Sequence, residues 1–114
     1  MSLNHNSTRF QLIKQNEAII RHINDTKSVH NYITNEFSPN VSLSVTKADE
    51  CNIAETTQYD RIYFFLEGRM ILNIEGQEFV LRANDSIFIE AGMSYDIKGT
   101  FRSVVVNQPA FGNR

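Results

Sequence analysis

The sequence contains little cysteine and no tryptophan, and its scarcities exclude several classes of protein. Its single cysteine, Cys51, can neither close a disulfide within the chain nor build a cysteine zinc site. Apolar runs are short, such as "YFFL" at residues 63–66, so none could cross a membrane as a helix. The start, "MSLNHNSTRFQ", lacks the apolar segment of a signal peptide. We therefore expect a cytoplasmic protein without a membrane partner.

An excess of positive charge is also missing. The chain carries 11 Lys and Arg against 13 Asp and Glu, which gives a net charge of −2. Nucleic acids bind proteins through clustered basic side chains that displace counterions, so this balance argues against a nucleic-acid partner. What the chain does have is ordinary apolar content, 41% of 114 residues, which is enough for one hydrophobic core. We expect one domain over residues 10–114, preceded by a disordered end at residues 1–9.

Short β-strands dominate the pattern after residue 40. The segment "NVSLSVT" (40–46) alternates apolar and polar residues with the period of a half-buried strand. Before it, we expect strands at 10–13 and 28–34, whereas residues 17–23 fit either a strand or a helical turn. After it, turn residues separate short apolar segments and predict strands at 61–66, 69–74, 77–82, 86–91, 95–98 and 101–107. Such closely spaced strands without an amphipathic helix predict an all-β antiparallel sandwich or barrel.

The strand "RIYFFL" (61–66) is apolar on both faces. One face carries Arg61, Tyr63 and Phe65, and the other carries Ile62, Phe64 and Leu66. One face of an antiparallel sheet in a small domain usually meets water, so the second apolar face needs a cover. The cover could be the N-terminal segment, another part of a small sandwich, or a second subunit. We expect a homodimer, because symmetric dimers are the commonest oligomers.

Two stretches match a known pair of barrel motifs. In the phrase "FFLEG", Gly68 fits the glycine that closes the first motif, and in "ANDSIFIEAGMSY" (83–95) Asp85 and Gly92 fit the second. With the tail "VVVNQPAF" (104–111), these matches make the run from about 44 to 110 resemble a single-domain cupin. The resemblance implies a double-stranded β-helix, a jelly-roll-type cupin barrel of antiparallel strands.

All four positions where the resemblance would place metal ligands are changed. Glu55 and Thr57 fall at the two histidines of the first motif, Arg61 at its glutamate, and Tyr95 at the last histidine of the second. Only Glu55 is a good ligand, and Arg61 is a cation that repels a metal. A register shift of one residue brings in Asp60 but still no histidine. We therefore expect neither a metal nor another cofactor.

Arg61 is the residue of most interest, because an inward arginine in a small barrel is costly unless it is paired. It could pair with Glu55, so that an ion pair fills the place of the metal. It could instead bind the carboxylate or phosphate of a small ligand, with Thr57, Tyr63 and Tyr95 as further polar contacts. The two interpretations are compatible, since a ligand anion could compete with Glu55.

Metal-independent binding of a small, anionic molecule in the barrel is the function that these residues favour. One alternative is a metal-independent isomerase, epimerase or lyase that acts on a small, sugar-like substrate through Glu55 and Tyr95. Another is a structural or interaction module that works through its outer face. Four further residues receive plainer interpretations: Cys51 as an unreactive thiol in a loop, Asp49 with Glu50 as a solvated turn, and His30 as a surface or hydrogen-bonded histidine.

Overall fold

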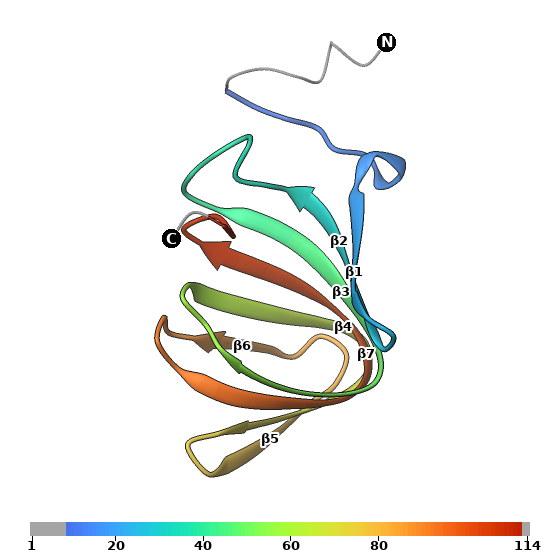
Figure 1. The fold of residues 1–114 in the computed structure, drawn as a ribbon, viewed down its shortest axis with the longest axis vertical. Coiled ribbons are helices and arrows are strands. Elements are labelled where there is room, and N and C mark those ends of the chain that lie inside the picture. The colour runs from blue at the N-terminus through green and yellow to red at the C-terminus, as the bar shows by residue number, and fades with distance from the viewer. Residues whose placement is uncertain (1–8, 113–114) are drawn as a thin grey trace.

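The structure is a computed structural model that describes residues 9–112. Within that range the chain is almost entirely β-structure, as Figure 1 shows. A short 3₁₀ helix at Gln15–Glu17 precedes strands β1 (Ile19–Asn24), β2 (Lys27–Ile33), β3 (Ser42–Thr56), β4 (Asp60–Ile74), β5 (Gln77–Leu81), β6 (Ser86–Ile89) and β7 (Ser94–Gln108). No helix in this part of the chain is long and apolar enough to span a membrane. The all-β prediction is confirmed.

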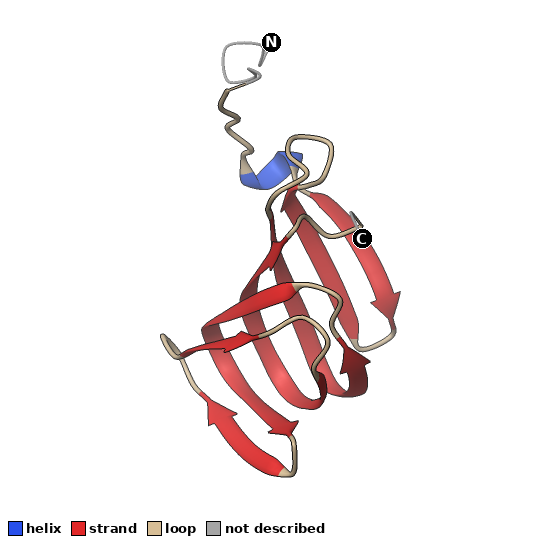
Figure 2. Ribbon diagram, turned by 90° about the vertical axis from the view of Figure 1, so that its left-hand side faces the viewer, coloured by secondary structure: helices blue, strands red, loops and turns tan. Residues whose placement is uncertain are grey.

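All strand pairings are antiparallel, in the order β1-β2-β3-β7-β4-β5, with β6 paired to β4. The last strand, β7, thus lies at the centre of the sheet, between β3 and β4. Figures 1 and 2 show the sheet curling round into an open barrel, with β1 and β2 at one end and β5 at the other. We call these the open end (β1, β2, residues 42–48 of β3, 60–65 of β4 and 101–108 of β7) and the packed end (β5, residues 51–56 of β3, 69–74 of β4 and 94–99 of β7).

The three long strands, β3, β4 and β7, bend at one level of the barrel. Glu50 has a positive φ of 50° beside a bulge, and Gly68 and Gly99 have φ values of 89° and 135°. A Cβ atom on Gly99 would lie 2.1 Å from the Arg69 carbonyl oxygen, so only glycine fits there. These bends let each strand serve both ends of the barrel without losing its partners.

The bends explain why several predicted boundaries were wrong. The predicted turn at residues 67–68 and the predicted gap at 99–100 are bends within β4 and β7. Cys51 was predicted in a loop, and Asp49 with Glu50 in a turn, but all three lie in β3. Cys51 is buried, and burial is the main cause that raises the pKa of its thiol.

The N-terminal part also differs from the prediction. Residues 10–13 contribute only an isolated bridge at Gln11, and the ambiguous segment 17–23 contains the start of β1. His30 in β2 pairs with Val45, and it is not among the residues that line the cavity described below. Of the predicted disordered end, residues 1–8 lie outside the described residues.

The hydrophobic core fills the packed end of the barrel. Met70 and Leu72 of β4 are fully buried there with Leu81 of β5, and the core continues past the bends to Phe65, Phe101 and Val105. The opposite face of β4 is different, since Ile62 and Phe64 are 42% and 41% exposed. The second apolar face of "RIYFFL" is therefore left largely uncovered by the described chain.

Candidate functional site

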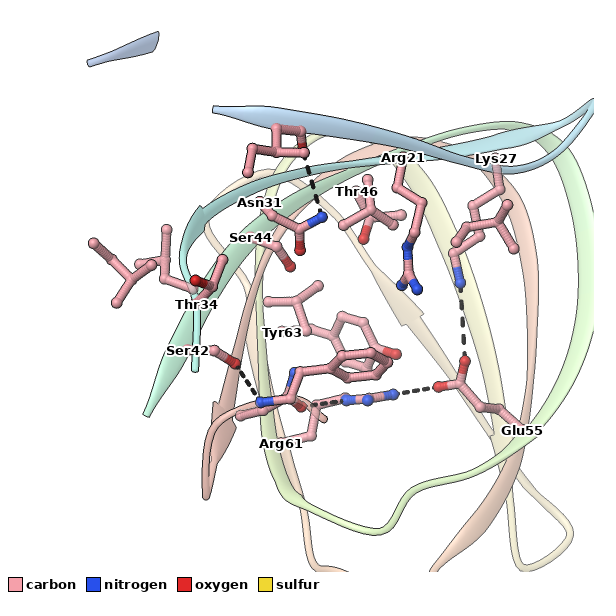
Figure 3. A pocket seen from close by; sticks show the side chains of 18 of the residues that line it. Arg21, Lys27, Asn31, Thr34, Ser42, Ser44, Thr46, Glu55, Arg61 and Tyr63 are labelled. Carbon is pink, nitrogen blue, oxygen red and sulfur yellow. Dashed lines mark hydrogen bonds and ion pairs between the residues drawn. The ribbon is translucent and has the colours of Figure 1, made fainter. Parts of the chain in front are cut away.

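A cavity of about 390 Å³ occupies the open end of the barrel. Its walls come from the inner faces of β1, β2, β3, β7 and the start of β4, with Phe111 of the C-terminal tail on one side. The size falls within the range of pockets for small organic ligands. Figure 3 shows Arg21, Asn31, Thr46, Glu55, Arg61 and Tyr63 gathered around this space.

A hydrogen-bonded cluster around Arg61 forms one wall of the cavity. Arg61 Nη1 donates to the Glu55 carboxylate in an ion pair and to the Tyr95 hydroxyl at 2.8 Å. The Tyr95 hydroxyl donates to Glu55 Oε2 at 2.7 Å and lies 2.9 Å from the hydroxyl of Tyr63. Arg61 Nε donates to Asn107 Oδ1 at 2.7 Å. The structure therefore contains the ion pair that was one of the two interpretations of Arg61.

The environment of the cluster keeps its tyrosines neutral and its arginine charged. Burial, followed by the Glu55 carboxylate, raises the pKa of Tyr63 to about 12. Burial, followed by Tyr63, also raises the pKa of Tyr95. Burial alone would lower the pKa of Arg61, but Tyr63, Tyr95 and Glu55 more than offset it and raise that pKa. At neutral pH both phenols act as hydrogen-bond donors.

The structure brings together four of the five residues predicted for the site. Glu55, Arg61 and Tyr63 line the cavity, and Tyr95 lies behind them in contact with all three. Thr57 is elsewhere: it does not line the cavity, and its hydroxyl donates to the Tyr59 carbonyl at 2.9 Å. That bond holds the tight connection between β3 and β4, so Thr57 has a local structural contact.

Sequence reasoning missed three polar residues of this region. Asn107 in β7 pairs with Arg61 across the sheet, and Lys27 in β2 lies 3.8 Å from Glu55 Oε1. Arg21 in β1 lines the cavity, with its guanidinium carbon 5.3 Å from the centre of the Phe111 ring. Arg21 and Lys27 precede the motif region, Asn107 lies in the tail after it, and only the strand order places them near Arg61. The alternation within each strand is the one signal that could have indicated their inward direction.

Positive charge exceeds negative charge in the cavity wall. The ionisable lining residues that carry a charge at neutral pH are Arg21, Lys27 and Arg61 against Glu36 and Glu55. Glu55 faces two of the cations, Arg61 and Lys27. Arg21 has no ion pair within the described residues. An anion that enters the cavity can therefore pair with Arg21, whose charge is not balanced by a carboxylate of the described residues.

The residues at the positions of the cupin metal ligands do not fit a metal ion. The Arg61 guanidinium lies among them and donates to both Glu55 and Tyr95, so the only carboxylate of the set already faces a fixed cation. Thr57 is turned away toward Tyr59. Residues 9–112 contain no group of three or more His, Cys, Asp or Glu that could hold a metal. A divalent ion at this place would meet a cation instead of a set of anionic or imidazole donors.

A curled antiparallel sheet with an internal cavity at one end defines the class of small β-barrels called cupins, and the predicted resemblance is confirmed. The EutQ-like cupin domain model matches residues 35–105, and the chain belongs to that family. No curated protein matches the chain significantly.

Solved structures agree with the family assignment. An ethanolamine utilization protein Q from Salmonella typhimurium is 24% identical with a TM-score of 0.69, over 74% of this chain and 70% of that one. KdgF from a Halomonas species is 11% identical with a TM-score of 0.78, over 90% and 96%. A variant of Streptomyces PAC13 with uridine is 13% identical with a TM-score of 0.75, over 89% and 83%. At these identities the similarity establishes the fold.

Proposed function

We propose that this protein binds a small organic molecule with an anionic group in the cavity at the open end, without a metal. The observation that carries the proposal is the cavity itself, about 390 Å³ with an excess of cationic side chains in its wall. A barrel that served only as scaffold would be filled by its own side chains, as the packed end is. The fold does hold organic ligands elsewhere, since the PAC13 structure contains uridine.

The Arg61 cluster supports binding because it is rigid and still has a donor to offer. Its bonds to Asn107, Glu55 and Tyr95 use Nε and Nη1, and Nη2 has no partner among the described residues. Side chains fixed before a ligand arrives lose little freedom on binding. The cluster is therefore a preorganised polar wall of the binding cavity.

The test is a titration of the full chain with anilinonaphthalene sulfonate, a fluorescent organic anion. We expect saturable binding of about one dye per chain, unchanged by a chelator, and loss of that binding in Ser44→Phe. Ser44 lines the cavity, and a phenyl ring there would fill much of it. Phe88→Ser is the matched control, because Phe88 is 60% exposed on the outer face. Dye binding that survives in Ser44→Phe but disappears in Phe88→Ser would contradict the proposal.

A metal-independent isomerase or lyase is a second candidate, and one observation favours it. The Tyr95 hydroxyl and the Glu55 carboxylate are 2.7 Å apart, which is a short path for a proton. The raised pKa values of Tyr95 and Tyr63 oppose it, since an acid catalyst works best when its pKa lies near the operating pH. A sugar substrate turned over in D₂O would exchange a carbon-bound proton for deuterium, detected by NMR. Exchange that is lost in Tyr95→Phe would establish this candidate, and no exchange with any aldose or ketose tested would rule out that chemistry.

We also propose a homodimer formed through the outer face. Ile62, Phe64 and Phe88 are exposed by 42%, 41% and 60%, and Ile62 pairs directly with Phe88 across β4 and β6. Val104 and Val106 of β7 lie beside them in register. Sedimentation should show a dimer that Phe64→Glu converts to a monomer, whereas Val80→Glu on β5 should leave it intact. A wild-type monomer at micromolar concentration would contradict the proposal.

A further inference from the structure

The two arginines that line the cavity are in opposite electrostatic situations. Arg61 is 7% exposed, and its charge is balanced by Glu55. Arg21 is exposed on the edge strand β1 and has no ion pair within residues 9–112. A ligand anion at Arg61 would have to share that guanidinium with Glu55, and the two negative charges would repel. Arg21 makes no ion pair with a carboxylate of the described residues, so a ligand anion would not have to share its guanidinium in this way.

Arg21 is held in place over the cavity by an aromatic ring. Its guanidinium carbon lies 5.3 Å from the centre of the Phe111 ring, at cation–π distance. Phe111 is fixed in turn, since its backbone N–H donates to Ser42 Oγ at 2.9 Å and its ring lies 5.3 Å from that of Tyr59. A guanidinium that stacks on a ring keeps its N–H edges available for a carboxylate. Arg21 is therefore an oriented donor.

Two hydroxyl groups face the same space from β3. Thr46 and Ser44 line the cavity, and their hydroxyls have no partner among the described residues. Thr46 pairs with Val29, and Val29 pairs with Arg21, so Thr46 and Arg21 lie in one row of the inner face. Figure 3 shows Arg21, Ser44 and Thr46 projecting into the space above Arg61. Thr46 is only 5% exposed, and a hydroxyl that faces the cavity without a protein partner is available to a ligand.

Apolar side chains make up another part of the cavity wall. Val29, Ile53, Ile97 and Val105 all line the cavity. They come from three adjacent strands, β2, β3 and β7, with Ile97 and Val105 in the two halves of β7. A ligand that satisfies both halves of the wall has an apolar body and one anionic group.

From these contacts we infer that Arg21, with the hydroxyls of Ser44 and Thr46, is the subsite that holds the anionic group of the ligand, and that the ligand is an amphipathic organic anion with an apolar body. This inference rests on the proposed function and names its ligand class. Arg21 determines the specificity for a charged ligand, whereas Arg61 and Glu55 balance each other's charge in the polar wall of the cavity.

The experiment compares two dyes that share an apolar body, anilinonaphthalene sulfonate and the uncharged N-phenylnaphthylamine. In the full chain, Arg21→Gln should weaken binding of the sulfonate roughly tenfold or more, because a charge-assisted pair is lost. It should affect the neutral dye far less. Arg69→Gln is the matched control, since Arg69 is exposed on β4 and does not line the cavity. It removes the same charge and should leave both dyes within about twofold.

Two further variants separate the subsite from a general effect of the fold. Arg21→Lys keeps the charge and should retain most of the sulfonate affinity. Thr46→Val removes only the hydroxyl from a side chain of the same shape and should weaken the sulfonate by roughly threefold to tenfold. Thermal unfolding of each variant shows that the barrel is intact.

Three results would overturn the inference. In the first, Arg21→Gln and Arg69→Gln weaken the sulfonate equally, which indicates a general field effect. In the second, Arg21→Gln weakens both dyes equally, which indicates a packing role for the side chain. In the third, Arg61→Met abolishes sulfonate binding and Arg21→Gln does not, which leaves the proposed function standing with its anion at Arg61. Failure of the wild-type chain to bind either dye would overturn the proposed function and the inference together.

Discussion

The two ends of this barrel are built from the same three strands and differ in the side chains they turn inward. At the packed end β4 contributes Met70 and Leu72, both fully buried. At the open end β3 contributes Ser42 and Thr46, and β7 contributes Ser103 and Asn107. Small polar residues in place of large apolar ones leave room for the cavity. The comparison teaches that the backbone provides a uniform barrel and that side-chain volume decides which end is hollow.

The largest change in stability is expected from a cavity created at the packed end. Leu72→Ala removes a fully buried side chain and should lower the free energy of unfolding by roughly 2–5 kcal/mol. Urea unfolding measures this loss. Dye binding at the open end should persist under native conditions, because Leu72 is absent from the cavity wall. Loss of less than about 1 kcal/mol would mean that the core does not reside at this end.

The open end is expected to depend on its polar cluster in the way that the packed end depends on Leu72. Arg61→Met leaves the half-buried Glu55 with only the longer contact to Lys27 and should cost roughly 2–4 kcal/mol in urea unfolding. The double variant Arg61→Met with Glu55→Gln should recover a part of that loss, because the carboxylate that lost its main partner is then replaced by a neutral amide. Additive losses from the two changes would show that the pair is not coupled.

Alkaline pH should weaken the open end selectively. The pKa of Tyr63 is raised to about 12 in the folded protein, against an ordinary value of about 10. A raised folded pKa gives a stabilisation that is complete below pH 10 and is lost as pH rises toward 12. We expect the free energy of unfolding to fall across that window in the wild-type chain and to fall less steeply in Tyr63→Phe. Equal slopes for the two chains would contradict the assignment to Tyr63.

The smallest effect is expected from adding volume where the barrel is hollow. Ser44→Val places two methyl groups in the cavity and should change the free energy of unfolding by less than about 0.5 kcal/mol. An enlargement at the packed end, Leu72→Phe, should cost roughly 1–3 kcal/mol, because Leu72 is fully buried in the core and does not line the cavity. Similar costs at the two positions would show that the cavity is closed to side chains.

Much of the fold is readable in the sequence, but the bends are not. Alternation and turn residues indicated the strands, and Gly68, Asp85 and Gly92 indicated the cupin class. Gly68 and Gly99 looked like strand ends, because a glycine in a turn and a glycine in a bend give the same local pattern. A turn differs from a bend in whether strand pairing continues past the glycine. The sequence of one strand does not indicate which strand it pairs with.

Some residues of the site could be predicted from the sequence, and others could not. Glu55, Arg61 and Tyr95 were found because the motif spacing of the cupin resemblance sets their positions, and the structure joins them in one cluster. Arg21 and Lys27 precede the motif region, and no local pattern indicates which strand they will lie beside. Their place depends on the strand order β1-β2-β3-β7-β4, which is a property of the whole sheet.

The central position of β7 has a consequence for how the chain acquires its shape during synthesis. Both β3 and β4 pair with β7, and Ser42 has its register partner at Asn107, so the middle of the sheet emerges from the ribosome after its flanks. Contacts over such long sequence separations slow folding. Until β7 is synthesised, the β1-β2-β3 unit and the β4-β5-β6 unit have unpaired edges, which exposes them to association with other nascent chains. Pausing of translation or chaperone capture just before residue 94 should therefore change the yield of native protein more than the same delay after residue 108.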